Sequence, residues 1–308
     1  MGGIGEGGCL SQIRQWKLYT TIQECNKESK YPIDSSCELL DVSRSAYYKW
    51  ASHKICSREL ENERIAELAE KIHRESPDKG YRRIRDDLSH YHGIEISDKK
   101  ALRICRGKDI KSTIKYNSHG CTRNAANPQH IAENILNREF HADKPNEKWL
   151  TDVTEFKYYV GIVVHKIYLS AILDLYDRRI VAYRISDRND NTLVFETFDR
   201  AVRANPDANP LFHSDRGFQY TNRVFYHKLM EAGMTQSMSR VGRCIDNGPM
   251  EGFWGILKRE RYYGKRFTAR ETLVQMIEDY IVYYNTKRLQ RNLGVMTPLM
   301  KNELYFAT

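Results

Sequence analysis

After Ser57 the apolar positions recur every three or four residues, which is the period of an α-helix that buries one face. Turn-forming residues at 76–80 and Gly93 separate three such runs. Ser97, like Ser57, stands where residues that cap helix N-termini are favoured. The pattern predicts three short helices, the middle one over 81–91. Their inward positions are Leu60, Ile65, Leu68, Ile72, Ile84, Leu88, Ala101, Leu102 and Cys105.

From Lys148 onward the pattern changes to short runs rich in β-branched and aromatic residues. These runs predict strands over 149–156, 167–174, 179–186, 211–214 and 235–239. Helical patterns cover 191–203 and 221–232, and a later helix has Leu273, Ile277, Tyr280, Ile281 and Tyr284 on its inner face. This order predicts the α/β class, with a mixed sheet flanked by helices in the ribonuclease-H-like arrangement.

The chain divides into regions that differ in composition and in hydrophobic pattern. The glycine-rich start is irregular, and two proline-containing pairs, Asn127-Pro128 and Lys144-Pro145, are typical of a linker. We therefore expect an irregular N-terminal region with short helices over 1–56, a helix-turn-helix region over 57–120, a linker over 121–147, and the sheet with its C-terminal helices over 148–308.

An excess of positive charge indicates an anionic partner. Lys and Arg number 49 against 40 Asp and Glu, which gives a net charge of +9 and a pI near 9.1. Between Arg82 and Lys115, ten basic residues stand against five acids, and such a surplus suits contact with DNA phosphates. The alternatives are a helical bundle that only packs, and a charge that serves solubility.

The cysteines and the apolar stretches exclude several classes of protein. Seven cysteines form no Cys-x-x-Cys pair, so we expect neither a disulfide framework nor a structural zinc site. The longest apolar stretch, 161–175, is interrupted by His165 and Lys166 and is too short for a membrane span. The first residues lack the order of a secretory signal. We expect a cytoplasmic protein without membrane contact.

Three acidic residues stand where metal-dependent phosphodiester chemistry needs them. Asp152 lies within a predicted strand, where aspartate is unusual, and Asp215 ends the strand 211–214. Glu251 stands in the first turn of a helix introduced by Gly248-Pro249, and 35 residues separate it from Asp215. Two divalent ions held by carboxylates can activate an oxygen nucleophile and stabilise a leaving oxygen. We predict that the three carboxylates converge on a metal site.

Other polar residues near these motifs are expected to serve the fold: Glu155, Asp174, Asp177, Glu260 and His213. Glu155 is an odd number of residues beyond Asp152, so in a strand it faces the other side. The two aspartates border a predicted turn. Glu260 lies on a different helical face from Glu251. We expect a structural or supporting role for His213.

Several runs resemble the motifs of the DDE transposases. The three catalytic signatures are matched by W-L-T-D-V-T-E-F, H-S-D-R-G-F-Q-Y and D-N-G-P-M-E-G-F-W-G-I-L-K, which contain Asp152, Asp215 and Glu251. Residues 284–298, 43–50 and 79–84 resemble further parts of the same proteins. The chain is similar, over about residues 37–300, to the second open-reading-frame product of bacterial insertion sequences of the IS-three family, relatives of the retroviral integrases.

The resemblance implies that Asp152, Asp215 and Glu251 bind two Mg²⁺ ions, with Mn²⁺ as an alternative, to cleave DNA and transfer a strand. Lys258 stands seven residues after Glu251, as in the family. Seven residues span about 10.5 Å and nearly two helical turns, so the lysine shares the glutamate's face. The residues expected to contact DNA are Lys258, Arg240, Arg243, Arg259, Arg82, Arg83, Lys99, Lys100 and Arg103.

The resemblance also implies partners. These are the ends of an insertion sequence and target DNA, further copies of the chain in an oligomer on DNA, and an upstream-frame product of the same element. The implied location is the bacterial cytoplasm, at the nucleoid. Two alternatives stay open: a non-catalytic DNA-binding regulator derived from a transposase, and a hydrolase of RNA–DNA hybrids. Gly248, Gly252 and Gln290 depart from the family's usual residues, and none replaces a predicted ligand.

Overall fold

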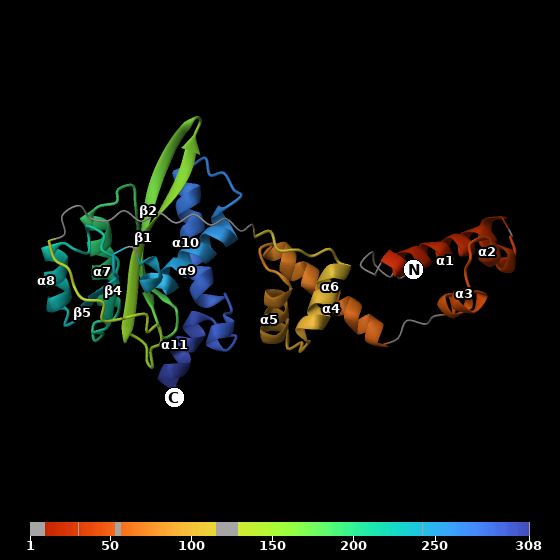
Figure 1. Ribbon diagram of the computed structural model, residues 1–308, viewed down its shortest axis with the longest axis horizontal. Coiled ribbons are helices and arrows are strands. Elements are labelled where there is room, and N and C mark those ends of the chain that lie inside the picture. The colour runs from red at the N-terminus through yellow and green to blue at the C-terminus, as the bar shows by residue number, and fades with distance from the viewer. Residues whose placement is uncertain (1–9, 30, 53–56, 115–128, 242, 308) are drawn as a thin grey trace. The chain divides into compact units, whose positions relative to one another are not determined.

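The computed structural model describes residues 10–29, 31–52, 57–114, 129–241 and 243–307 (Figure 1). Contacts within the chain divide it into two compact units, residues 1–113 and 114–308. The predicted irregular start and the first part of the predicted linker, with Asn127-Pro128, lie outside the described residues. Among the helices in the described ranges, none has the length and apolar composition that a membrane span requires.

Three helices of the first unit surround a small core. They are α1 (Leu10–Ser29), α2 (Ile33–Leu39) and α3 (Arg44–Ala51), and their buried residues are Ile22, Cys37 and Tyr47. Tyr19 and Trp50 pack beside this core with ring centroids 5.5 Å apart. The 20-residue α1 was not expected from the sequence, because its apolar residues do not gather on one helical face.

Helices α4 (Ser57–Glu75), α5 (Tyr81–His92) and α6 (Asp98–Gly107) confirm the three helices predicted from the apolar period. Gly93 ends α5 in the left-handed conformation, with φ 64°. The Ser97 hydroxyl accepts a hydrogen bond from the Lys100 backbone N–H (3.2 Å) and caps α6. Leu60, predicted to point inward, is 61% exposed. It lies outside the core because α4 is longer than the two helices it packs against.

Five strands of the second unit form one mixed sheet in the order β3-β2-β1-β4-β5 (Figure 1). The strands are β1 (Lys148–Val160), β2 (Val163–Asp174), β3 (Ile180–Ser186), β4 (Leu211–Ser214) and β5 (Thr235–Met238). The first three pair antiparallel, β4 pairs parallel with β1, and β5 pairs parallel with β4. All five predicted strands are confirmed. β1 continues beyond the predicted end at residue 156, so β1 and β2 form one long hairpin.

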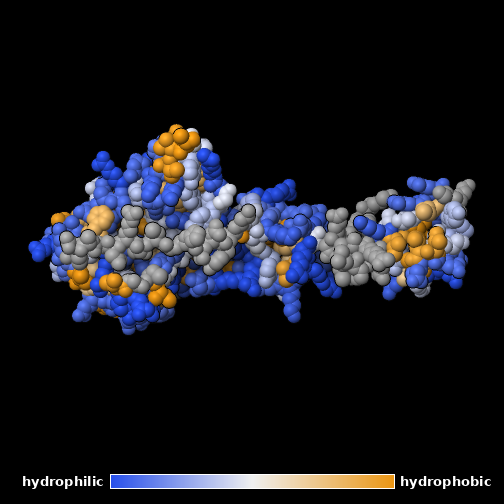
Figure 2. All heavy atoms as spheres, turned by 45° about the horizontal axis from the view of Figure 1, so that its top comes forward, coloured by the Kyte–Doolittle hydropathy of each residue, from blue (hydrophilic) through white to orange (hydrophobic). Residues whose placement is uncertain are grey.

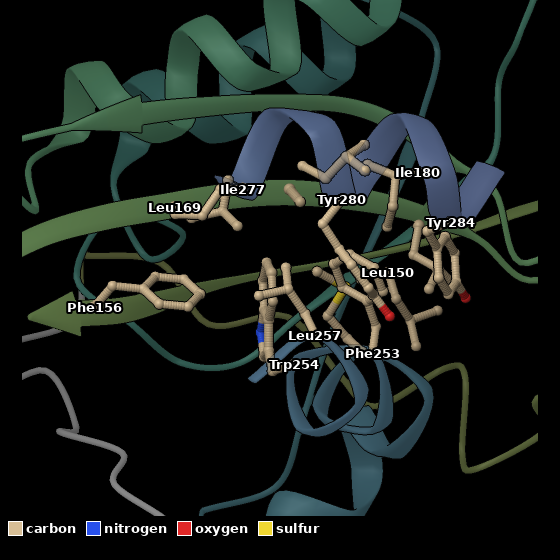
Figure 3. Close-up of a cluster of buried hydrophobic side chains, with 14 of the residues drawn as sticks. Leu150, Phe156, Leu169, Ile180, Phe253, Trp254, Leu257, Ile277, Tyr280 and Tyr284 are labelled. Atoms are coloured by element: carbon tan, nitrogen blue, oxygen red, sulfur yellow. The ribbon is translucent and has the colours of Figure 1, made fainter. Parts of the chain in front are cut away.

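Helices cover both faces of the sheet. Side chains alternate along a strand, so Trp149 and Leu150 of β1 enter different cores. The Trp149 core contains α7 (Asn191–Ala204) and α8 (Arg223–Glu231). The Leu150 core contains α9 (Gly248–Leu257) and α10 (Arg270–Thr286), whose side chains meet those of β1 and β2 in Figure 3. The predicted inner face of α10 is confirmed.

Shorter elements complete the second unit. A 3-10 turn, η1 (Cys244–Asn247), precedes α9, and a π-helix, η2 (Lys258–Tyr262), follows it directly. A further 3-10 turn, η3 (Arg291–Leu293), and α11 (Pro298–Ala307) follow α10. Ahead of β1, Leu136 and Ala142 are buried in the Leu150 core. The part of the predicted linker after residue 128 therefore packs into the core of the second unit.

Candidate active site

Asp152 stands on the face of β1 that helix α9 covers. It shares this face with Leu150 and Phe156, since side chains alternate along the strand. Its Oδ2 accepts a hydrogen bond from the Trp254 indole N–H of α9 (3.0 Å), and its Oδ1 accepts one from the Val153 backbone N–H (2.7 Å). Both carboxylate oxygens are thus oriented by donors from the protein.

Asp215 lies beside Asp152 because of the strand register. β1 and β4 are parallel, and Leu150 pairs with His213. Asp152 and Asp215 each lie two residues beyond this pair, so they stand at the same level, at the carboxyl end of β4. A turn follows in which Asp215 Oδ1 accepts a hydrogen bond from the Gly217 backbone N–H (2.9 Å).

Glu251 is brought to the two aspartates by the start of α9. Pro249 occupies the first turn of this helix, where its missing N–H leaves no hydrogen bond unmade. The preceding Asn247 side chain donates to the Thr151 backbone carbonyl of β1 (3.0 Å), one residue before Asp152. This contact fixes the helix start to the strand, and Glu251 is exposed to solvent.

Electrostatics show that the three carboxylates act on one another. Burial and then the negative charge of Asp215 raise the pKa of Asp152 to about 8, and Glu251 adds to this effect. Burial and then Asp215 raise the pKa of Glu251, and burial raises the pKa of Asp215. Three acids that oppose one another's ionisation form a site that a cation would stabilise.

The donor set fits a hard divalent cation. Carboxylate oxygens are the ligands that Mg²⁺ and Mn²⁺ prefer, and all three predicted ligands are carboxylates. Within the described ranges, no three His, Cys, Asp or Glu side chains lie close enough to enclose an ion as they stand.

Lys258 lies next to the strand that carries Asp152. Its ammonium group donates to the Thr154 hydroxyl (2.7 Å) and is 5.1 Å from the centroid of the Phe156 ring. Thr154 is two residues beyond Asp152 and therefore shares its face of β1. The lysine is the first residue of the π-helix η2, and such π-turns are frequent at functional sites.

A buried carboxylate that sequence reasoning missed organises the loop before α9. Asp246 is fully buried and accepts hydrogen bonds from the side chains of Arg240 (2.8 Å), Arg138 (2.6 Å) and Asn134 (3.0 Å). The hydrogen bonds from Arg240, and then the one from Arg138, hold its pKa well below the usual range. The signal in the sequence was the run Asp246-Asn247 just before the glutamate helix.

The predicted DNA-contacting residues fall in different surroundings. Arg240 is bonded to Asp246, whereas Arg243 is exposed and Arg259 is half-buried. In the first unit, the Arg83 guanidinium pairs with Asp78 (2.9 Å), and Arg82 lies over the Tyr81 ring (5.6 Å). Lys99 and Arg103 are exposed on α6, and Lys100 is half-buried.

The acids set aside as structural have the contacts expected of such residues. Glu155 pairs with Lys166 (2.9 Å). Asp174 and Asp177 are fully buried at the turn between β2 and β3. Asp174 accepts a hydrogen bond from the Tyr176 backbone N–H, and Asp177 accepts one from the Arg179 backbone N–H (2.8 Å each). Glu260 pairs with Arg288 (2.8 Å).

His213 also has a structural setting. It is buried between the hydroxyls of Ser237 (2.9 Å) and Ser239 (3.0 Å) of β5 and the loop after it. Burial lowers its pKa to about 4. The ring is therefore neutral at physiological pH and links β4 to its neighbour.

Comparison with known proteins agrees with this architecture. Residues 142–244 and 251–300 match models described as "Integrase core domain", and residues 59–117 match a model described as "HTH-like domain". A mixed sheet between helices, together with these matches, defines a polynucleotidyl transferase of the transposase and integrase class with the ribonuclease-H-like fold.

Relatives among known protein sequences give the family. The chain is 34% identical over 278 residues to "Putative transposase InsK for insertion sequence element IS150" of Escherichia coli (strain K12), covering 89% of this chain and 95% of the relative. It is 33% identical over 272 residues to "Insertion element IS600 uncharacterized 31 kDa protein" of Shigella sonnei, covering 87% and 98%. The chain belongs to the insertion-sequence transposases of the IS-three family, as its motifs predicted.

One solved structure aligns with part of the chain. "Structure of the HTLV-2 integrase catalytic core domain in complex with magnesium (dimeric form)" covers 53% of this chain and 99% of that chain, with a TM-score of 0.40 and 15% identity.

Proposed function

We propose that this transposase cleaves the ends of an insertion sequence and transfers the freed strand to target DNA at a site formed by Asp152, Asp215 and Glu251. One observation carries the proposal: β1, β4 and α9 bring these acids together so that each opposes the ionisation of another. Such a cluster destabilises the protein unless a cation occupies it, which is typical of a metal-dependent active site.

In this proposal the three carboxylates hold two Mg²⁺ ions, or Mn²⁺ in their place. When bound, the ions supply activation of the attacking oxygen and stabilisation of the leaving oxygen. The chain's own groups set the geometry. The Trp254 indole and the Val153 N–H orient the oxygens of Asp152, and Asn247 fixes the start of the helix that carries Glu251. Such supporting hydrogen bonds commonly tune a metal site.

Basic residues around the site would hold the DNA. Lys258 places a cation on the Asp152 face of β1, where a phosphate next to the reacting bond would pass. Arg243 precedes helix α9 in the sequence, and Arg259 follows it. Arg240, although bonded to Asp246, keeps a side chain that is 46% exposed.

The first unit would supply further DNA contacts through helix α6. Lys99, Arg103 and Arg106 are exposed on this helix at spacings of four and three residues, which places them on one face. Arg82 is exposed at the start of α5, and Arg83 and Lys100 are partly buried nearby in the sequence. A helix with a basic exposed face and an apolar buried face suits docking against duplex DNA.

We further propose that the protein acts as an oligomer on DNA at the bacterial nucleoid. Both ends of an element must be held together for strand transfer to complete, so more than one copy is expected. In this proposal an upstream-frame product of the same element is a further partner in that assembly.

Strand transfer on a duplex that carries the element's end tests the site. Asp152→Asn, Asp215→Asn and Glu251→Gln should each abolish Mg²⁺-dependent cleavage and joining while DNA binding persists. Glu155→Gln is the matched control, because this acid stands on the same strand but pairs with Lys166. Retained activity in any of the three variants refutes the assignment. If the unaltered protein binds the DNA but does not cleave it, with Mg²⁺ and likewise with Mn²⁺, the result would instead indicate a DNA-binding regulator.

A further inference from the structure

The outer end of the β1–β2 hairpin exposes a run of apolar side chains. Val160 is 53% exposed, Ile162 98%, Val163 53% and Val164 50%. Gly161 turns the chain with φ 61°. These residues, 160–164, form the hairpin tip, visible as the apolar patch at the top of Figure 2.

The tip extends beyond the rest of the sheet. β4 pairs with β1 only over residues 148–150, and β3 pairs with β2 only over residues 168–173. From Lys157 to Lys166 the two strands of the hairpin pair with each other alone, and the hairpin projects from the sheet in Figure 1. A projecting apolar tip contributes nothing to either core, so its composition indicates a contact surface.

Side-chain and backbone contacts make the hairpin rigid. The Tyr262 hydroxyl accepts from the Lys157 backbone N–H (2.9 Å) and donates to the Lys157 carbonyl (3.1 Å). The Tyr159 N–H donates to the Phe267 carbonyl (2.8 Å). The Arg266 guanidinium lies over the Tyr159 ring (5.0 Å) and donates to the Gly161 carbonyl (3.3 Å). The segment that follows the π-helix thus supports the hairpin up to its turn.

The charge around the tip is complementary to DNA. Lys157, Lys265 and Arg266 are exposed beside it, and the nearest acid on the hairpin, Glu155, is shared between Lys166 (2.9 Å) and Lys157 (3.9 Å), so the basic residues remain in excess. Apolar side chains flanked by basic ones are the composition of wedges that enter the minor groove and unstack a base step. A surface for a second protein would need no such excess of positive charge at its rim.

The hairpin also connects the tip to the active site. Asp152 and Val160 lie on the same strand, eight residues apart, which corresponds to about 26 Å. Along B-DNA, at about 3.4 Å per base pair, this is about eight base pairs. A duplex that runs along the hairpin from a reacting phosphate at Asp152 would therefore reach the tip.

We propose that the hairpin tip is a DNA wedge, in which Ile162 and its neighbours enter the minor groove and unstack a base step within about one helical turn of the reacting phosphate. The proposal rests on the proposed function, which puts a duplex at Asp152. Distortion there would bend the DNA and bring target and element end together over the site.

The test uses the full chain and mixed-sequence duplexes that each carry one 2-aminopurine, whose fluorescence rises when it is unstacked. Without divalent metal, the unaltered protein should raise the fluorescence at one or two neighbouring positions. Ile162→Ser should abolish the rise, while affinity measured by anisotropy changes less than about threefold, because phosphate contacts supply most of it. Ile162→Leu should restore the rise. Val282→Ser, on a 59% exposed valine of α10, is the matched control.

The outcomes separate this proposal from the proposed function. Asp152→Asn should keep the fluorescence rise, because unstacking needs no chemistry. A rise that survives Ile162→Ser, or no rise at any position, overturns the wedge whether or not strand transfer occurs. If Ile162→Ser instead converts an oligomer to a smaller species in sedimentation velocity without DNA, the tip binds a second copy of the chain and the wedge is refuted.

Discussion

Arg288 forms a buried ion pair that connects the C-terminal part of the second unit to the π-helix after α9. Its Nη2 donates to Glu260 Oε1 (2.8 Å), its Nε lies 3.2 Å from both carboxylate oxygens, and the Tyr280 hydroxyl donates to Oε2 (2.9 Å). The side chains of Arg288 and Glu260 are 12% and 3% exposed. Replacing either partner leaves the other charge in a poorly hydrated site.

The expected magnitude follows from this burial. Arg288→Met or Glu260→Gln alone should lower the free energy of unfolding of the second unit by about 3–5 kcal/mol, because removal of one partner leaves an uncompensated buried charge. The double variant leaves no buried charge, so its free energy of unfolding should fall less than that of Arg288→Met alone. Arg270→Met is the matched control. Its pair with Asp187 is equally short (2.7 Å) but exposed, and such pairs contribute about 0–1 kcal/mol.

Urea unfolding measures these differences. Of the four tryptophans, Trp149 and Trp254 belong to the second unit, so their fluorescence reports on it in a background with Trp16→Phe and Trp50→Phe. The unfolding midpoint and slope give each free energy. The reasoning is refuted if either single substitution costs less than about 1 kcal/mol, or if the double variant loses the sum of the two single losses, because uncoupled partners are additive.

Three further predictions concern residues near the site. Trp254→Phe removes the donor to Asp152 and should lower strand transfer or metal affinity about 10–100-fold, measured by metal titration of activity. Asp246→Asn should lower Tm at neutral pH. Because the folded pKa of Asp246 is depressed, its stabilisation is present above the unfolded value of about 3.9, so the Tm difference should shrink as pH falls below about 4. The folded pKa of His213, about 4, lies below the unfolded value of about 6.5. Its stabilisation is therefore lost as pH falls between these values, and ring-nitrogen NMR should show a neutral ring at about pH 5.

The apolar period predicted most of the elements because most of them have one buried and one exposed face. Helices α4 to α6 and strands β3 to β5 are found where the sequence places them. α1 was not predicted, since its apolar residues are scattered around the helix. The outer end of the β1–β2 hairpin was missed because it is apolar yet exposed. A pattern that equates apolar with buried cannot find a surface of that kind.

The candidate site combines residues that local motifs identify with contacts between residues far apart in the chain. The sequence proposes the three acids because each stands in a short motif with a recognisable element around it, and their assignment as metal ligands stays a prediction. Their supporting contacts could not be predicted, because they join residues far apart in the chain. Trp254 and Asp152 are separated by 102 positions, and Arg138 and Asp246 by 108. The packing of α9 on β1 brings the first pair together, and the packing of the segment ahead of β1 against the turn η1 brings the second.

The register of α9 on β1 follows from a match between strand and helix dimensions. Asp152 and Thr154 are two residues apart on one face of β1, or about 6.6 Å. Their partners Trp254 and Lys258 are four residues apart, or about 6.0 Å along a helix. The two contacts can therefore form together only when α9 runs alongside β1 in one alignment. Glu251 is three residues before Trp254 and thus on the same helical side. We infer that these two contacts, rather than the 35-residue spacing alone, determine where the glutamate meets the aspartates.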